Sequence, residues 1–216
     1  IKSLQRQGFS LDEIKHLLTQ CPLSDLIVMM DEKRAALREQ IAQQNAVYER
    51  MTSATDLLRD CTRLRMQPRL CAGSAAYLID FDSVSALWAA VPKMPLLKDL
   101  IDALPLTNYC TTIPLALLSG QSAATRVGIV APVEFTHVIH ADFSQMRMCA
   151  GPQTVKTIFE LRPPEDSSMQ PVIDLTREFL QAHRLTPVCE GYTRQYAWFV
   201  DGDGQMRHYS ELIVPV

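Results

Sequence analysis

The sequence lacks a long apolar run without charge, and this absence argues against a membrane-spanning helix. Its longest uncharged stretch, residues 103–125, contains two prolines and four threonines, whereas a transmembrane helix needs about 20 mostly apolar residues. The first residues are charged and have neither an apolar core nor a small-residue cleavage site, which excludes a secretory signal peptide. Because they begin in the middle of a pattern, we expect a piece of a longer cytoplasmic protein.

Catalytic and metal-binding motifs are also missing. The six cysteines are at least ten residues apart, so no C-x-x-C pair can start a zinc or redox site, and there is no P-loop, G-x-S-x-G or H-E-x-x-H motif. His137 and His140 lie three apart on an expected strand and would point to opposite faces, which makes them a poor metal pair. His140 and Asp142 could form an acid–base pair, but ordinary surface pairing is favoured. We therefore predict no cofactor, no metal site and no enzyme.

Strong basic charge is absent as well. The formal net charge is −3, but residues 1–70 carry 11 Lys and Arg against 9 Asp and Glu, while the remainder carries 10 against 15. A free-standing nucleic-acid binder usually has a clearly basic face. The net −5 of the larger part is compatible with a cationic ligand, although an acidic surface that only favours solubility explains it equally well.

What is present begins with two short helices around a Gly8-Phe9 break. Ser10 and Glu13 have the spacing of a capping box, in which each side chain bonds to the other residue's backbone N–H. Pro22 should end this region, and Ser24 can cap the next helix.

Residues 24–63 contain neither Gly nor Pro, and their apolar residues recur close to every seventh position. This pattern predicts a coiled-coil helix of about 40 residues, roughly 60 Å long, whose seam is buried against a partner chain. A hairpin of two shorter helices is the alternative, but it lacks a turn residue. The predicted dimerisation residues are Leu26, Met30, Leu37, Val47, Met51 and Leu58, with Ile41, Tyr48 and Thr55 beside them.

After Gln67-Pro68 the pattern changes to short runs rich in Val, Ile, Leu, Thr and aromatic residues, which predict strands. The expected strands are residues 75–81, 111–118, 127–135, 155–161, 188–200 and 206–214; the expected helices are 93–103 and 171–183. Strands interleaved with two helices predict an α+β domain on an antiparallel sheet. Residues 201–204, Asp-Gly-Asp-Gly, predict the last hairpin turn, and Met206 and Leu212 in place of the required Gly and Glu exclude an EF-hand.

Glu211 is the main candidate binding residue. In an ideal strand it shares a face with Tyr209, and on the neighbouring strand Tyr192, Tyr196 and Trp198 also share a face. If these faces coincide, a carboxylate lies among aromatic rings, an arrangement suited to a lipophilic cation. The alternative is that Glu211 pairs with Arg194 or Arg207 on a solvated face of the sheet.

Two segments resemble known families. The segment IKSLQRQGFSLDEIKHLLTQ is similar to the end of the DNA-binding domain of MerR-family transcription regulators, which carries a phrase of the type LRxLGFSLxEIKxLL. The ending HYSELIVPV resembles the closing strand of GyrI-like, or BmrR-like, effector-binding domains. The resemblance implies a remnant of the DNA-binding domain at 1–22, an antiparallel dimerisation helix at 23–66, and a GyrI-like domain at 70–216.

The resemblance also implies a function. Such regulators are homodimers that distort promoter DNA so that RNA polymerase can engage it, and drug-sensing members bind lipophilic cations beside a glutamate matching Glu211. The alternation of side chains along the last two strands adds four candidate binding residues, Tyr192, Tyr196, Trp198 and Tyr209. Weaker candidates are Tyr77, Phe81, Phe135 and Phe143. The winged helix-turn-helix is missing, so DNA and polymerase are expected partners of the full-length protein only. The alternatives are a GyrI-like hydrolase, with Glu211 and a tyrosine as base, and a protein-binding scaffold.

Overall fold

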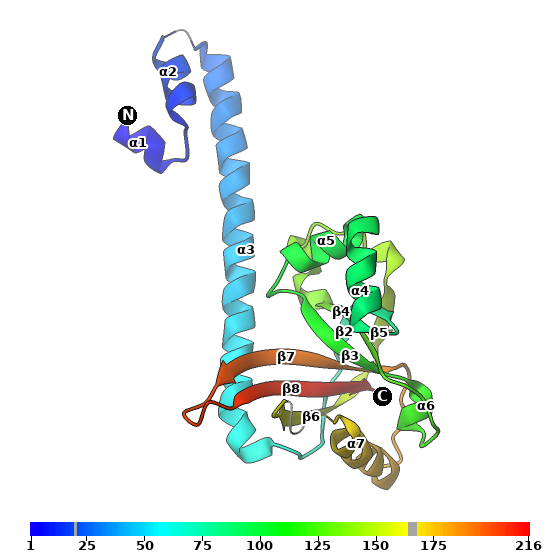
Figure 1. The fold of residues 1–216 in the computed structure, drawn as a ribbon. Helices are drawn as coiled ribbons and strands as arrows, with labels where there is room; N and C mark the ends of the chain where they lie inside the picture. The colour runs from blue at the N-terminus through cyan, green and yellow to red at the C-terminus, as the bar shows by residue number, and fades with distance from the viewer. Residues whose placement is uncertain (20, 164–167) are drawn as a thin grey trace. The chain divides into compact units, whose positions relative to one another are not determined.

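The structure, a computed structural model, describes residues 1–19, 21–163 and 168–216 (Figure 1). It divides into two compact units, Ile1–Tyr48 and Glu49–Val216. The long helix α3, Leu23–Leu64, runs from the first unit into the second.

The first unit begins with helices α1, Lys2–Arg6, and α2, Leu11–Thr19. The predicted capping box is confirmed: the Ser10 backbone N–H donates to Glu13 at 2.7 Å, and the Glu13 N–H donates to the Ser10 hydroxyl at 3.2 Å. Phe9 and Ile14 are buried. Lys33 of α3 forms an ion pair with Glu13 at 2.9 Å, and its ammonium lies 5.4 Å from the centre of the Phe9 ring.

Helix α3 is one continuous helix of 42 residues, so the hairpin alternative is wrong. The prediction that Ser24 caps it is also wrong, because the helix begins at Leu23 and already includes Ser24. The Pro22 carbonyl accepts the Leu26 N–H at 3.1 Å, and the Ser24 hydroxyl instead donates to the Asp25 carboxylate.

The second unit is built on one antiparallel sheet of eight strands in the order β1-β6-β8-β7-β3-β4-β2-β5. The fold is α+β, as predicted. The strands are β1 Arg69–Ala72, β2 Ala75–Phe81, β3 Asn108–Ile113, β4 Arg126–Pro132, β5 Arg147–Ala150, β6 Gln153–Leu161, β7 Gly191–Val200 and β8 Met206–Pro215. The helices are α4 Val84–Ala90, α5 Pro95–Asp102, α6 Leu115–Leu118 and α7 Gln170–Ala182, with 3-10 turns η1 Val91–Lys93, η2 Val133–Val138 and η3 Phe143–Gln145.

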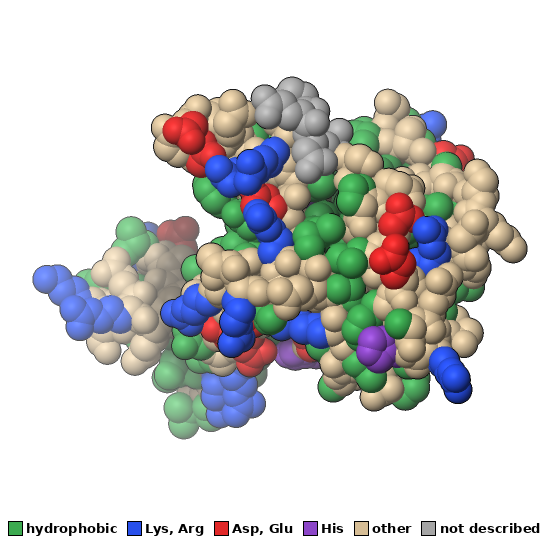
Figure 2. Space-filling model, turned by 90° about the horizontal axis from the view of Figure 1, so that it is seen from below, with side chains coloured by type: hydrophobic (Ala, Val, Ile, Leu, Met, Phe, Trp, Pro, Cys, Tyr) green, Lys and Arg blue, Asp and Glu red, His purple; other side chains and the backbone are tan. Residues whose placement is uncertain are grey.

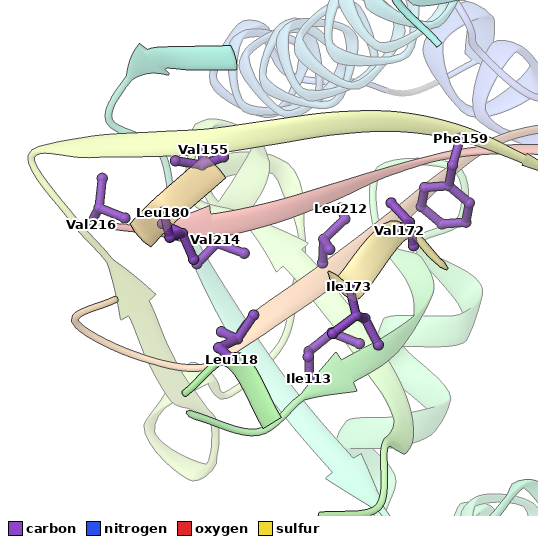
Figure 3. Packing of buried hydrophobic residues seen from close by; sticks show 10 residues of the cluster. All are labelled: Ile113, Leu118, Val155, Phe159, Val172, Ile173, Leu180, Leu212, Val214 and Val216. Atoms are coloured by element: carbon purple, nitrogen blue, oxygen red, sulfur yellow. The ribbon is translucent and has the colours of Figure 1, made fainter. Parts of the chain in front are cut away.

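The sheet has two halves that meet at β3 and β7 through only two paired positions. Helix α7 covers one face of the β6-β8-β7 half, and Figure 3 shows Leu180 of α7 beside Val214 of β8 and Ile173 of α7 beside Ile113 of β3. Helices α4 and α5 pack on the β4-β2 half through a second cluster that includes Leu97 and Leu100. Each half therefore has its own apolar core.

Several predicted boundaries were wrong where proline intervenes. Strand β3 ends at Ile113 because Pro114 follows, and residues 115–118 form α6 rather than a continuing strand. Strand β4 ends at Pro132, and residues 133–138 form η2. Strands β1 and β5 and helix α4 were not predicted. The hairpin at residues 201–204 is confirmed, with Gly204 at φ +76°.

Within the described ranges, none of the helices has the length and apolar character needed to cross a bilayer.

Candidate functional site

Glu211 lies in the middle of β8, opposite Ile158 of β6 and Arg194 of β7. It is only 3% exposed, so a solvated sheet face is wrong for this residue. The Tyr196 hydroxyl donates a hydrogen bond to its Oε2 at 3.2 Å. A buried carboxylate thus accepts from a phenol at the position where the sequence predicted a ligand counter-ion.

Two long cationic side chains reach toward this carboxylate. Arg69 Nη2 lies 3.8 Å from Oε1, and Lys156 Nζ lies 3.9 Å from Oε2. Both distances are longer than a hydrogen bond, so neither contact fixes its geometry. Arg194, one of the two pairing partners expected from the sequence, forms an ion pair with Glu134 at 3.2 Å instead.

Tyr196 is held as a neutral donor. Burial raises the pKa of its phenol, and the nearby negative charge of Glu211 raises that pKa further. Its ring also lies under the Arg50 guanidinium, whose central carbon is 4.5 Å from the ring centre.

The aromatic residues of β7 do not all face Glu211, because a bulge between Gln195 and Ala197 shifts the register. Beyond the bulge Trp198 is opposite His208, with ring centres 4.9 Å apart. The prediction that Trp198 shares the face of Tyr196 is therefore wrong. Phe199, which the sequence reasoning missed, takes that place and stacks on Tyr209 at 5.8 Å.

The other two predicted tyrosines lie on the expected face but have separate environments. Tyr192 is fully buried in a cluster with Leu78 and Ile213, between the two halves of the sheet. The Tyr209 hydroxyl donates to Glu160 at 3.3 Å.

The weaker aromatic candidates are not brought to Glu211. Tyr77, Phe81 and Phe143 pack in the α4–α5 core, because the odd-numbered residues of β2 face those helices while Leu78 faces the other cluster. Tyr77 and Phe143 lie with ring centres 5.0 Å apart. Phe135 is buried in η2.

A cleft of about 530 Å³ lies beside the Glu211 face. It is lined by Leu58, Cys61, Thr62 and Arg65 of α3 and the segment after it, and by Phe199 and Tyr209. Acidic and basic side chains lie next to one another on the face seen in Figure 2.

Glu160, next to this cleft, is buried among arginines. Arg162 and Arg207 contact it at 2.7 and 2.8 Å, and Arg65 also bonds to it. Burial acts to raise the pKa of Glu160, but these arginines outweigh it and the pKa is lowered. This carboxylate is fully neutralised and is not available to a ligand cation.

An aromatic groove of about 270 Å³ opens where β7 diverges from β3. Trp88 of α4, Tyr109 and Trp198 line it, and the rings of Trp88 and Tyr109 lie 6.1 Å apart. Trp88 is 51% exposed. The sequence analysis missed this groove because it did not predict α4, and the exposure of Trp88 cannot be read from the sequence.

His137 lies in the 3-10 turn η2 and not on a strand. The expectation that His137 and His140 point to opposite faces of a strand is therefore wrong. Among the described residues no group of three or more His, Cys, Asp or Glu side chains could hold a metal ion. Asp142 accepts hydrogen bonds from the backbone N–H and the hydroxyl of Ser144, at 3.1 and 2.6 Å.

Helix α3 has two different faces. Arg50, Leu57 and Cys61 are buried against the sheet. Exposed apolar side chains of α3 form a stripe, which we call the outer stripe; it consists of Leu37, Ile41, Tyr48 and Met51. Of the other predicted seam residues, Met30 is exposed, whereas Leu26, Val47 and Leu58 are half-buried.

Comparison with known proteins gives a match for the first quarter of the chain. Residues 1–54 match the family model described as MerR, DNA binding. This segment is therefore similar to the DNA-binding domain of MerR-family proteins. The match covers the capping box, α2 and the first 32 residues of α3. A comparison of the chain with curated proteins found no match.

The solved structures that are similar to this chain are distant. The EcmrR C-terminal domain is 11% identical with a TM-score of 0.40, covering 68% of this chain and 94% of its own. SAV2435 bound to tetraphenylphosphonium is 12% identical with a TM-score of 0.36, covering 69% and 92%. An uncharacterized conserved protein from Listeria innocua is 9% identical with a TM-score of 0.35, covering 72% and 96%.

Proposed function

We propose that this chain is the dimerisation and effector-sensing part of a MerR-family transcription regulator. The observation that carries the proposal is the family match over residues 1–54, a segment that includes the exposed outer stripe of α3. The full-length dimer would distort promoter DNA so that RNA polymerase can engage it, and effector binding would shift the equilibrium toward the distorting state.

For the effector we propose a lipophilic cation that binds beside Glu211. The buried carboxylate needs a positive counter-charge, and Arg69 and Lys156 supply it only at 3.8 and 3.9 Å. Their side chains are 34% and 24% exposed and flexible, so a cation can displace them. The rings of Tyr196 and Tyr209 on the same face would add cation–π attraction.

This proposal is tested by titrating the chain with tetraphenylphosphonium in a calorimeter. Wild type should bind, and Glu211→Gln should weaken binding by about 1.5–3 kcal/mol, because a carboxylate facing a desolvated cation is removed. Glu178→Gln, which removes an exposed carboxylate on α7, is the matched control and should bind as wild type. Equal affinity of wild type and Glu211→Gln would refute the counter-ion role.

A further inference from the structure

Arg50 is a buried cation for which no carboxylate partner is found in the described part of the chain. The residue is 5% exposed, and its guanidinium takes part in none of the ion pairs found there. Burial lowers its pKa below the ordinary arginine value. Buried charges are normally paired, so this one needs an explanation.

The hydrogen bonds of Arg50 account for only part of its donors. Nη2 donates to Asn108 Oδ1 at 2.8 Å and to the Gln195 carbonyl at 2.7 Å, and Nε donates to the Pro105 carbonyl at 3.3 Å. Nη1 is buried without a hydrogen-bond partner, and so is the side-chain amide Nδ2 of Asn108. Two adjacent buried donor groups thus lack an acceptor, which is unfavourable for the folded protein unless a ligand supplies one.

Arg50 and Asn108 also line a pocket of about 250 Å³. Its remaining wall is mainly apolar and aromatic and includes Met51, Ala54, Leu104, Pro105, Tyr109 and Tyr196. Met51 and Leu104 are 63% and 41% exposed, so these flexible side chains can move to admit a molecule.

The chemistry of the donors selects the ligand. A planar guanidinium and a neutral amide offer one positive charge and several N–H groups, which match the two oxygens of a monoanionic carboxylate. A more highly charged anion such as a phosphate would be under-compensated by a single cation, and the pocket is apolar beyond its charged end.

We propose that this pocket binds a small organic carboxylate, its charged end at Arg50 and Asn108 and its apolar body against Met51, Leu104 and Tyr109. The pocket borders the site proposed at Glu211, because Tyr196 lines the pocket and donates to that carboxylate, but its ligand has the opposite charge. Because Arg50 belongs to α3 while Asn108 and Gln195 belong to β3 and β7, a bound carboxylate would strengthen the attachment of the helix to the sheet.

The test uses benzoate as the probe and benzamide, a neutral molecule of the same shape, as its control. Millimolar benzoate should raise the melting temperature of the chain and show saturable binding by calorimetry, and benzamide should do neither. An absent benzoate effect, or an equal effect of benzamide, would overturn the proposal.

Asn108→Asp is the informative variant. It places a carboxylate against Arg50 with almost no change in shape, so the protein supplies its own anion. We expect this variant to melt at the same or a higher temperature than wild type and to bind benzoate on the order of tenfold more weakly or worse. Undiminished benzoate binding by Asn108→Asp would show that the site is elsewhere.

Arg50→Met should also lose benzoate binding, and Arg59→Met, which removes an exposed arginine of the same helix, should retain it. If Arg50→Met does not fold, Asn108→Asp still decides the question. Glu211→Gln tests the cation site separately, so each proposal can fail without the other.

Discussion

Dimerisation through the outer stripe of α3 can be tested by changing two of its residues to glutamine. Leu37 and Ile41 are 45% and 58% exposed and lie one helical turn apart. Glutamine has a helix propensity close to that of leucine, so Leu37→Gln with Ile41→Gln should preserve α3 while removing apolar surface from the stripe.

The expected effect follows from the exposed area. Complete burial of a leucine or isoleucine contributes about 1.5–3 kcal/mol, so covering the exposed half of each contributes about 1 kcal/mol. In a twofold dimer both residues occur twice, which gives a total near 4 kcal/mol. The dimer dissociation constant should therefore rise by about three orders of magnitude.

Sedimentation velocity over a range of concentrations measures this shift, and circular dichroism verifies that the helix content is retained. The matched control is Ala35→Gln with Arg38→Gln, two exposed positions of α3 that are not part of the outer stripe. The reasoning is refuted if the stripe variant and the control have the same dissociation constant, or if the wild-type chain is monomeric at all concentrations.

Two further predictions concern stability. Leu212→Ala should lower the free energy of unfolding by about 2–5 kcal/mol, because Leu212 is fully buried in the cluster under α7. Urea denaturation measures this free energy. The prediction is contradicted if Leu115→Ala, at an exposed position, lowers it by more than Leu212→Ala does. Burial lowers the pKa of His208 to about 4, while the unfolded chain takes up this proton near pH 6.5. The unfolding free energy should therefore fall, by at most about 3 kcal/mol, as the pH drops from 6.5 to 4. Measured by urea denaturation, the unfolding free energy of His208→Gln should lack this part of the pH dependence. A variant with the same pH profile as wild type would count against the burial of the imidazole.

The sequence predicts best where residues close together in the chain determine the local geometry. Ser10 and Glu13 form their capping box, the turn at residues 201–204 forms between β7 and β8, and α3 forms as one helix. Each of these features depends on neighbouring residues only, so it can be recognised without knowledge of the tertiary fold.

The failures depend on interactions that no local pattern contains. A bulge at Gln195 reversed the parity of Trp198, because one inserted residue exchanges the two faces of a strand. Strands β1 and β5 have four residues each, too short to show alternation. Arg50 lies within the predicted coiled-coil helix, and only its contacts with Asn108 and Gln195, far along the chain, reveal its burial.

A crystal structure of the chain bound to tetraphenylphosphonium tests the central claim most directly. The account predicts one cation per chain beside the Glu211 carboxylate, against the rings of Tyr196 and Tyr209, with Arg69 and Lys156 displaced from that carboxylate. A cation bound elsewhere, for instance in the aromatic groove of Trp88, with Arg69 and Lys156 still beside Glu211, would contradict it.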